Sequence, residues 1–496
     1  MSSDALGERF RQVCRDSRSA LAVRDLSEGR SLSFGDLYDQ HETIIRALSS
    51  LRLGPGSPII SLVGNRPVFF PLVAACMSAR AALIPLGDTT DDEAMSVLTR
   101  SGARAIVTDR SLPVESIDQV PLSHGIRIVA LSEPALPPPH RESVILKLTS
   151  GSTDVPKAAV ASVEHMVNDG RHMIEAMGIA ASDINLTCVP LSHAYALGNV
   201  VMPLLLQGTG VALRQSFNPA QLMADAEAAG ATIFPGVPFM FDRLRSLDLE
   251  RLPARLRLLI TAGARIDPVT VAWFRQSLGR QIHSLFGSSE TGGITYDAAG
   301  EVSDPLTVGR PMPETTVEIR QPDDTGAGRI FVKGTAVTSS YAYGGDTVGQ
   351  IGAQTSQSSG GDEDTAGGFV DGGFLTGDVG YFDTRGRLIL TGRASTTVNV
   401  AGLKVNPTEI ERVLRDLPGI EDARVMGASC DHRGQRLVAF VVSDHALTSV
   451  DIRQRCARLL SPHKIPRQFI FLDQIPLDAR GKLDRRLLEA LAAAAS

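Results

Sequence analysis

The chain has 496 residues, of which 43% are hydrophobic and 21% charged, and its formal net charge is −6. The length predicts about three domains or subdomains, and the acidic balance argues against a general nucleic-acid or anionic-membrane surface. No apolar run reaches the length of a membrane span, and the first residues lack the apolar core of a signal peptide. The five cysteines show no metal-binding spacing, so we expect reduced thiols in a cytoplasmic protein.

Helical and extended patterns alternate along the first part of the chain. Residues 33–51 have helical spacing with Ser33 as the N-cap, and a second helix begins near Val163 behind a possible cap at Ser162. Apolar runs of strand length occur at 58–63, 82–86, 105–109, 144–150, 185–190 and 256–263. Strands that alternate with helices predict parallel βαβ units, so we expect an α/β fold that binds its ligands in the loops after the strands.

The pattern changes at residues 343–373, which are rich in Gly, Ser, Gln and Asp. Such a segment buries little apolar surface, so we expect a mobile loop, with a structured lid as the alternative.

A compact α+β pattern follows. Two strands joined by a DTRG turn precede a helix at 406–417 that begins with Asn406 as N-cap and Pro407 at its first position. Further strands are expected at 422–428, 436–443 and 468–475, and a helix at 450–460. We therefore expect an N-terminal domain of residues 1–393 and a C-terminal domain of residues 394–496.

Residues 146–160, LKLTSGSTDVPKAAV, have the composition of a phosphate-binding loop. Hydroxyl residues surround one glycine and a lysine follows: Thr149, Ser150, Gly151, Ser152, Thr153 and Lys157. Hydroxyls, backbone N–H groups and the ammonium are all donors for phosphate oxygens. The spacing differs from a Walker A loop, and taken alone the segment fits a polar turn without ligand equally well.

Three further turns, each with a carboxylate or a lysine, favour a phosphate-binding loop over a polar turn without ligand. Glu290 follows a strand-like segment in SLFGSSETGGITYD and, near a triphosphate, would hold Mg²⁺. Asp378 follows a glycine in FLTGDVGYF and suits a ribose diol, and Lys482 lies in a Gly-containing loop of PLDARGKLDRRLL. Taken alone, each residue also fits a role without ligand: Glu290 as a surface acid, Asp378 as a β-turn aspartate and Lys482 as a solvated lysine.

Together and in this order, the segments resemble the AMP-forming adenylating superfamily, which comprises acyl- and aryl-CoA synthetases, adenylation domains of nonribosomal peptide synthetases, and luciferases. TSGSTDVPKA resembles the family's phosphate loop, FGSSE its YGxTE motif, TGD and LTGR its ribose-binding segments, and PLDARGKLDRR its closing motif. PLSHAYALGN, ITAGARI and VNVAGLKVNPTEIE also resemble family segments, so the likeness covers nearly the whole chain. It implies a large N-terminal domain of α/β subdomains and a small mobile C-terminal lid.

The resemblance also implies roles for individual residues. His193 would lie near the substrate carboxylate, the backbone of Gly263 and Ala264 against adenine, and Asp378 and Arg393 at the ribose. Ser289 and Glu290 inherit phosphate and magnesium roles. Lys482 would be the adenylation lysine, Gly402 and Lys404 belong to the loop beside the thiol arm, and Ser395 stands at the hinge, where Asp or Lys is usual.

The implied reaction is the activation of a carboxylic acid by ATP and Mg²⁺ to acyl-AMP with release of pyrophosphate, followed by transfer to CoA. The alternatives are a ligase that loads an acyl carrier protein and a degenerate homologue that binds nucleotide without turnover. The latter is motivated by Asp154, which stands for a glycine of the phosphate loop and would repel phosphates unless a cation lay between. Ala158 and Gly373 also depart from the family pattern. A P-loop kinase or GTPase is the weakest interpretation, because the Walker spacing fails.

The expected walls of the acid pocket are residues 193–199, 234–241 and 287–295, which are mainly apolar or small and contain no Lys or Arg. Fatty or aryl acids are therefore favoured over dicarboxylates and amino acids.

Overall fold

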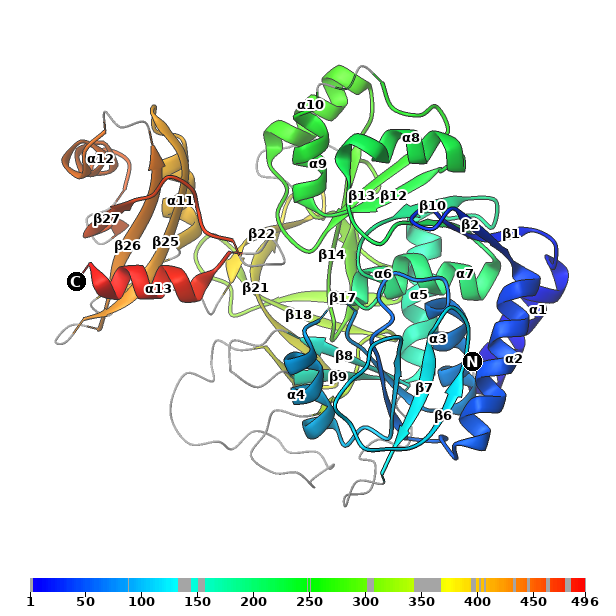
Figure 1. Ribbon diagram of the computed structural model, residues 1–496. Coiled ribbons are helices and arrows are strands. Elements are labelled where there is room, and N and C mark those ends of the chain that lie inside the picture. The colour runs from blue at the N-terminus through cyan, green and yellow to red at the C-terminus, as the bar shows by residue number, and fades with distance from the viewer. Residues whose placement is uncertain are drawn as a thin grey trace.

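The computed structural model describes residues 3–87, 89–132, 144–149, 157–247, 249, 251–300, 307–342, 367–393, 398–400, 403–405, 407–430, 434–443, 447–460, 464–477 and 483–495. Within these residues the strands form four sheets, three of them up to Arg393 and one from Val398 onward. Figure 1 shows the C-terminal part set apart from the larger N-terminal part. The chain thus has the mixed α/β architecture, with a large and a small part, that the sequence predicts.

The largest sheet has the strand order β16-β15-β14-β13-β12-β10-β11-β1-β2 in the described residues. Its centre is parallel from β1 through β11, β10, β12 and β13 to β14, and antiparallel strands complete both edges. The strands are β1 (Leu21–Asp25), β2 (Arg30–Ser33), β10 (Ile184–Thr187), β11 (Gly210–Leu213), β12 (Ile233–Gly236), β13 (Leu258–Ala262), β14 (Ile282–Ser288), β15 (Gly292–Tyr296) and β16 (Arg310–Pro311).

A second sheet has the order β19-β9-β8-β4-β3-β5-β7-β6 among the described strands. The strands β8, β4, β3 and β5 are parallel to their neighbours in this series, and the outer strands pair antiparallel. The strands are β3 (Pro58–Ser61), β4 (Ala82–Pro85), β5 (Ala105–Thr108), β6 (Ser116–Pro121), β7 (Arg127–Leu131), β8 (Ile145–Thr149), β9 (Lys157–Ala161) and β19 (Tyr341–Ala342). The predicted parallel βαβ units are confirmed in both sheets.

Helices cover both faces of the largest sheet. In Figure 1, α8, α9 and α10 lie on one side of β12 and β13, and α5, α6 and α7 lie on the other. The helices of this part are α1 (Ser3–Asp16), α2 (Phe34–Ser50), α3 (Phe69–Ala79), α4 (Asp91–Ser101), α5 (Val163–Met177), α6 (Ala194–Ala196), α7 (Met202–Gln207), α8 (Pro219–Ala229), α9 (Pro238–Arg245) and α10 (Pro268–Leu278), with a π-helical turn at Leu197–Val201. Ser33 and Ser162 are the N-caps of α2 and α5, as the sequence predicts, and each forms a capping box.

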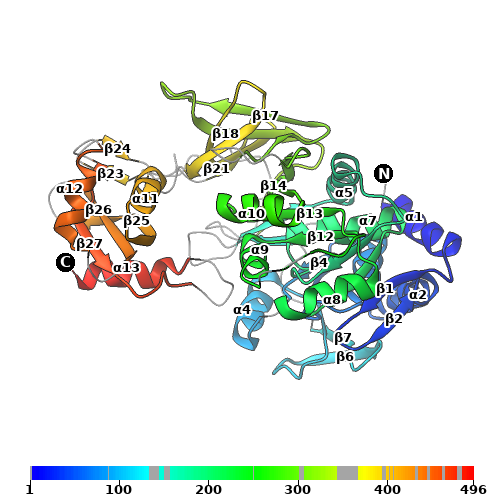
Figure 2. The same cartoon turned by 90° about the horizontal axis from the view of Figure 1, so that it is seen from above.

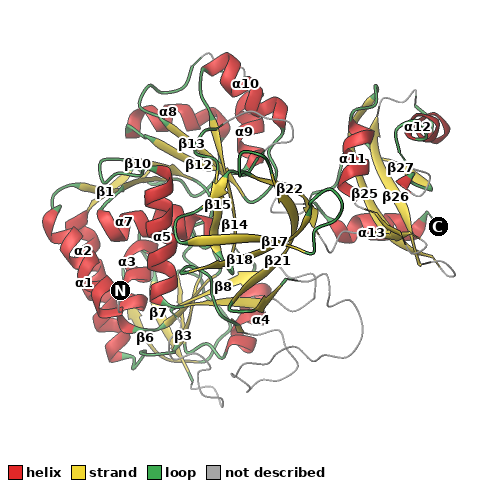
Figure 3. Cartoon of the chain, turned by 180° about the vertical axis from the view of Figure 1, so that it is seen from behind, coloured by secondary structure: helices red, strands yellow, loops and turns green. Residues whose placement is uncertain are grey.

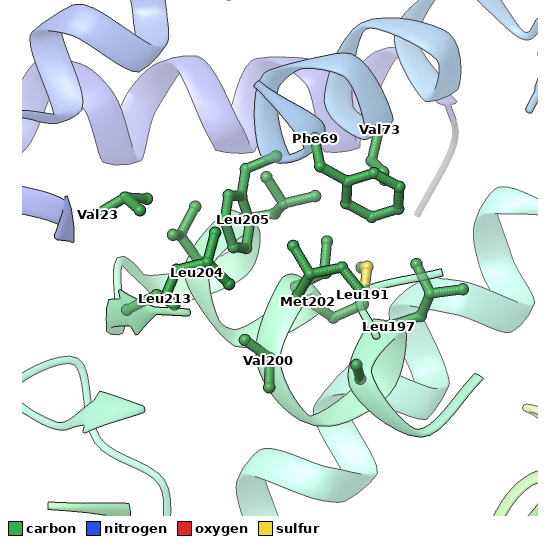
Figure 4. Close-up of a cluster of buried hydrophobic side chains, with 14 of the residues drawn as sticks. Val23, Phe69, Val73, Leu191, Leu197, Val200, Met202, Leu204, Leu205 and Leu213 are labelled. Atoms are coloured by element: carbon green, nitrogen blue, oxygen red, sulfur yellow. The ribbon is translucent and has the colours of Figure 1, made fainter. Parts of the chain in front are cut away.

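The main hydrophobic core joins α1, α2, α3, α5 and α7 to strands of both sheets. Figure 4 shows its centre, where Leu204 and Leu205 of α7 meet Phe69 and Val73 of α3 and Val23 of β1. Helix α3 is buried along nearly its whole length and ends at Arg80, whose backbone is left-handed. The apolar run around it is therefore a core helix, and no helix of the described residues is long and apolar enough to cross a membrane.

A third sheet follows, formed in the described residues by β17 (Thr315–Arg320), β18 (Gly328–Gly334), β20 (Gly368–Val370), β21 (Gly373–Phe382) and β22 (Leu388–Arg393). Figures 2 and 3 show it beside the nine-stranded sheet, on the side of the C-terminal part. The DTRG turn forms as expected, with Gly386 N–H bonded to the Asp383 carbonyl at 2.9 Å.

The prediction of a loop over residues 343–373 is wrong for the last residues of this segment. Residues 368–370 form β20, and Gly373 begins β21. The reason is Phe369, whose ring packs on Tyr341 and Phe374 and so gives this end of the segment an apolar anchor. Residues 343–366 lie outside the described part of the chain.

The C-terminal part has its own sheet and cores. The sheet contains β23 (Val398–Val400), β24 (Leu403–Val405), β25 (Ile420–Cys430), β26 (Gly434–Ser443) and β27 (Gln468–Phe471), and the helices are α11 (Pro407–Arg415), α12 (Ser449–Cys456) and α13 (Arg485–Ala494). Ile410 and Leu414 of α11 pack into one core cluster of this part, and α13 packs on another. Asn406, the predicted cap of α11, lies outside the described residues.

One glycine joins the nine-stranded sheet to the third sheet. Gly309 has φ +87°, its carbonyl accepts the N–H of Leu388 at 2.8 Å, and a Cβ there would overlap the backbone of Tyr296. Gly326 has a similar φ of +82°, but a Cβ there would meet no atom within 4 Å.

We expect Gly309→Ala to destabilise the protein more than Gly326→Ala. Left-handed strain alone costs roughly 1–2 kcal/mol, and overpacking against Tyr296 adds roughly 1–3 kcal/mol. Urea unfolding of both variants measures the difference. Equal losses would contradict the close approach of Gly309 to the Tyr296 backbone.

Candidate active site

Three of the predicted site segments follow parallel strands of the nine-stranded sheet. His193 comes after β10, Gly263 and Ala264 directly follow β13, and Glu290 lies in the turn after β14. The strands β10, β12, β13 and β14 are parallel, so these segments reach the same edge of the sheet. The carboxyl edge of an open parallel sheet is where ligands normally bind.

The turn after β13 presents bare backbone at this edge. Gly263 has φ +83°, no atom lies within 4 Å of where its Cβ would be, and both Gly263 and Ala264 are exposed. A left-handed residue with open space in front of it favours glycine and allows a flat ligand to approach the main chain.

The segment after β10 is tied to β13. His193 is the exposed N-cap residue of the short helix α6, which continues into the π-helical turn. The hydroxyl of Tyr195 donates to the carbonyl of Ile260 in β13 at 3.3 Å. Single π-turns occur frequently at functional sites, and this one holds the segment expected beside the acid.

Glu290 is held by both its main chain and its side chain. Its carbonyl accepts the N–H and the hydroxyl of Thr338 at 2.8 and 3.0 Å, and its Oε1 accepts the Tyr341 hydroxyl at 2.7 Å. Burial and the charge of Glu290 raise the pKa of Tyr341, so the phenol stays protonated and donates. The carboxylate therefore has a defined orientation at the sheet edge.

Tyr341 also meets Lys157, the lysine of the predicted phosphate loop. The Lys157 ammonium lies 5.5 Å from the centre of the Tyr341 ring, within cation–π range. The ring also packs against Phe369 and Phe374 of the third sheet at centroid distances of 5.0 and 6.5 Å. Lys157 and Glu290, which are far apart in sequence, therefore both interact with the Tyr341 side chain.

The two predicted ribose residues meet directly. Asp378 of β21 and Arg393 of β22 are register partners, and Arg393 Nε donates to Asp378 Oδ1 at 3.0 Å. Arg393 is exposed and Asp378 is about one fifth exposed, so both groups remain accessible at the end of the third sheet.

Two charged side chains are buried in the N-terminal part. Lys147 of β8 and Asp169 of α5 are 2% and 1% exposed. Burial lowers the pKa of Lys147, an effect that the charges of Asp169 and Glu290 oppose. Burial raises the pKa of Asp169, which Lys147, the Gly293 N–H and His172 oppose. Lys147 and Asp169 are therefore two buried charges that act on each other, and the partly buried Glu290 also acts on Lys147.

The donor set near Glu290 fits Mg²⁺ better than a metal held by protein alone. No group of three or more His, Cys, Asp and Glu side chains that could hold a metal occurs among the described residues. Mg²⁺ usually takes one or two carboxylates and completes its shell with water and substrate phosphates. One oriented carboxylate beside a phosphate loop matches that requirement.

Several predicted site residues lie outside the described residues: Ser150, Gly151, Ser152, Thr153, Ser395, Gly402 and Lys482, and with them Asp154. The same holds for the side chains of Thr149 and Lys404. The roles expected for these residues stay predictions.

Sequence reasoning missed Tyr341, Lys147 and Asp169. Tyr341 lies in a two-residue strand, and no local pattern marks it. Lys147 had a readable signal, because a charged residue in the apolar run 144–150 must be buried with a partner or interrupt the strand.

The sequence and the fold both match known proteins. The model of the AMP-binding enzyme family matches residues 10–342, and the model of the AMP-binding enzyme C-terminal domain matches residues 409–482. A 2-succinylbenzoate–CoA ligase of Bacillus pumilus is 26% identical over 95% of both chains. One from Enterococcus faecalis is 30% identical over 70% of this chain and 69% of its own length. The ATP-bound structure of MatB from Rhodopseudomonas palustris has the same fold, with a TM-score of 0.80, 22% identity and 99% of each chain covered.

We expect Tyr341→Phe to lower the free energy of unfolding by about 1.5–3 kcal/mol, because a hydrogen bond to a charged group is lost. Tyr381→Phe is the control, since the Tyr381 hydroxyl bonds to none of the described residues and its removal should change stability by less than about 0.5 kcal/mol. Urea unfolding of both variants decides the point. Two equal effects would mean that the bond to Glu290 contributes nothing.

Proposed function

Because the chain belongs to the AMP-binding enzyme family, we propose that it is an acid–CoA ligase. It activates a carboxylic acid with ATP to acyl-AMP, releases pyrophosphate, and transfers the acyl group to the thiol of CoA. The observation that carries this proposal is the meeting of Glu290 and Lys157 on Tyr341. Through Tyr341, the expected Mg²⁺ ligand and an expected phosphate-binding residue lie near each other at the edge of the sheet where ligands bind.

In the first half-reaction, the substrate carboxylate attacks the α-phosphorus of ATP. A carboxylate is a weak nucleophile, so catalysis has to come from positioning and from stabilisation of the charge at phosphorus. Residues 149–153 and Lys157 would bind the β- and γ-phosphates, and Asp378 with Arg393 would orient the ribose. The backbone of Gly263 and Ala264 would lie against adenine.

The remaining roles concern charge and the acid. Glu290, with Ser289 beside it, would hold Mg²⁺, which supplies positive charge to the phosphates when bound. Lys482 would reach the α-phosphate from the C-terminal part, and His193 would lie beside the acid. His193 is exposed at the sheet edge, which leaves it accessible to a substrate.

In the second half-reaction the C-terminal part would rotate about Ser395, taking Lys482 away and bringing the loop of Gly402 and Lys404 to the thiol arm. The proposed boundary between residues 393 and 394 is supported by sheet membership. β22 ends the third sheet at Arg393, and β23 opens the C-terminal sheet at Val398. Separate sheets and cores allow such a motion without unfolding either part.

The acid we propose is fatty or aryl. Phe234 and Ile294, from two of the expected wall segments, are fully buried. The curated relatives above are named for 2-succinylbenzoate, which carries an aryl ring. Its second carboxylate would find no Lys or Arg in residues 193–199, 234–241 or 287–295.

Pyrophosphate release, measured with acetate, medium- and long-chain fatty acids and aryl acids, tests this proposal. Free CoA and a holo acyl carrier protein as acceptors separate the two thioester products. ATP binding without pyrophosphate exchange for any acid would favour the degenerate homologue instead.

The cytoplasmic location is part of the same proposal. The free thiols of Cys14, Cys76, Cys188 and Cys456 are buried in the folded chain, which fits a reducing compartment.

We expect Lys482→Ala to abolish acyl-AMP formation and to leave thioester formation from supplied acyl-AMP largely intact, because the lysine acts only in the first half-reaction. Pyrophosphate release reports the first step, and thioester yield from synthetic acyl-AMP reports the second. Equal loss of both steps would contradict the proposed rotation of the C-terminal part.

We expect Asp154→Gly to preserve or raise affinity for MgATP, because it removes a carboxylate from the proposed triphosphate loop. Isothermal titration with MgATP measures the change. A collapse of binding would show that Asp154 contributes positively.

A further inference from the structure

Asn65 connects the second sheet to the segment that leads to His193. It lies in the loop between β3 and α3, at the carboxyl end of β3, and is 7% exposed. Its Nδ2 donates to the carbonyls of Val189 and Arg214, each at 3.1 Å, and its Oδ1 accepts the N–H of Leu191 at 2.8 Å. Both N–H donors of the amide and its oxygen are therefore bonded to backbone.

The backbone groups that Asn65 binds follow two neighbouring strands of the nine-stranded sheet. Val189 and Leu191 come after β10, and Arg214 directly follows β11. The two strands are parallel partners, so Asn65 lies across their carboxyl ends. The N–H of Arg214 also donates to the carbonyl of Thr187 at 2.9 Å, which joins the two strand ends to each other. Asn65 therefore binds the edge of the sheet at which the candidate site lies.

The loop that carries Asn65 is itself fixed in the second sheet. The N–H of Leu62 donates to the carbonyl of Val107 in β5 at 2.9 Å. The Arg66 guanidinium pairs at 2.7 Å with the carboxylate of Asp109, which directly follows β5. Helix α3, which comes next in the chain, is buried along nearly its whole length. Asn65 thus reaches out from a rigid support, as a side chain must if it is to position another segment.

A second loop of the same sheet packs on the segment that Asn65 binds. Gly87 follows β4 with φ +69°, and a Cβ there would lie 2.6 Å from the hydroxyl oxygen of Ser192. The N–H of His193 donates to the carbonyl of Pro190 at 3.1 Å, and His193 is then the N-cap residue of α6. Residues 189–193 therefore form a turn that contacts two loops of the second sheet just before His193.

We propose that Asn65 is a positioning residue for the acid side of the active site: its amide fixes residues 189–191 and thereby sets where His193 stands. Asn65 acts through the backbone of this segment. A misplacement of about 1 Å can cost an enzyme up to roughly 100-fold in rate, so such a support matters for the reaction. The role of His193 beside the acid rests on the proposed function, whereas the bonds of Asn65 to residues 189–191 do not.

Hydrogen–deuterium exchange of Asn65→Ala tests these bonds without any substrate. We expect the amide of Leu191 to exchange at least tenfold faster, because it loses its acceptor, and the amides of α5 to stay unchanged. Asn218→Ala is the matched control, since Asn218 Oδ1 also accepts a backbone N–H, that of Ala220 at 3.1 Å, but at the start of α8. Exchange in this control should change only near α8.

Pyrophosphate release gives the functional readout, with benzoate as an aryl acid and decanoate as a fatty acid. In Asn65→Ala we expect kcat/KM for the acid to fall about tenfold and the KM of MgATP to change less than about twofold, because the residues proposed for the phosphates and the ribose lie on other segments. In Asn218→Ala both constants should stay within about twofold of the wild type.

The double variant Asn65→Ala/His193→Ala tests whether Asn65 acts through His193. A side chain that is absent cannot be displaced, so kcat/KM for the acid should lie within about threefold of that of His193→Ala alone. Two losses that simply multiply would mean that Asn65 acts on the reaction by another route.

Three results would overturn the proposal: unchanged exchange at Leu191, equal effects on the acid and on MgATP, or multiplying losses in the double variant. If Asn65→Ala does not fold, Asn65→Ser takes its place, because its hydroxyl can satisfy one of the three backbone groups and the same changes are expected at about threefold. Failure of both variants to fold would contradict a positioning role. If the wild type releases pyrophosphate with neither acid, the proposed function fails, and exchange at Leu191 still decides whether Asn65 fixes this segment.

Discussion

The hydrogen bond from the Tyr341 hydroxyl to Glu290 connects parts of the molecule that are otherwise separate. Glu290 belongs to a turn of the nine-stranded sheet, Tyr341 lies on the edge strand of the second sheet, and the tyrosine ring packs on two phenylalanines of the third. A tyrosine suits this position because its ring buries apolar surface while its hydroxyl satisfies a charged acceptor. Since Lys157 also meets this ring, movement of Tyr341 would displace a carboxylate and an ammonium together.

The charge of the whole chain says little about its candidate site. The net charge is −6, yet two of the residues proposed to bind a polyanionic substrate, Lys157 and Arg393, are cations. Local cations beside oriented carboxylates are what a magnesium–triphosphate complex requires, since the metal needs oxygen ligands and the phosphates need positive charge. Asp154 therefore bears on how well this loop binds phosphate and does not change the proposed class of function.

The separation of the C-terminal part matters for a two-step reaction. Its sheet and hydrophobic clusters are built from its own residues, so it does not need the N-terminal part to complete its core. A part built in this way can change its orientation while each core stays intact. A reaction that needs a lysine in one step and a thiol channel in the next requires that freedom.

Local sequence patterns determined the parallel α/β class, the N-caps at Ser33 and Ser162, and the helix at 407–415, because each depends on neighbouring residues. The order of motifs also indicated the family and the reaction, and it placed Asp378 and Arg393 in one role before their contact was visible. Tertiary structure alone decided that Phe369 ends the 343–373 segment in a strand, that Tyr341 binds Glu290, and that Asp169 packs against the turn at Gly292 and Gly293. These features depend on strand register and on contacts between residues far apart in the chain, which no local pattern encodes.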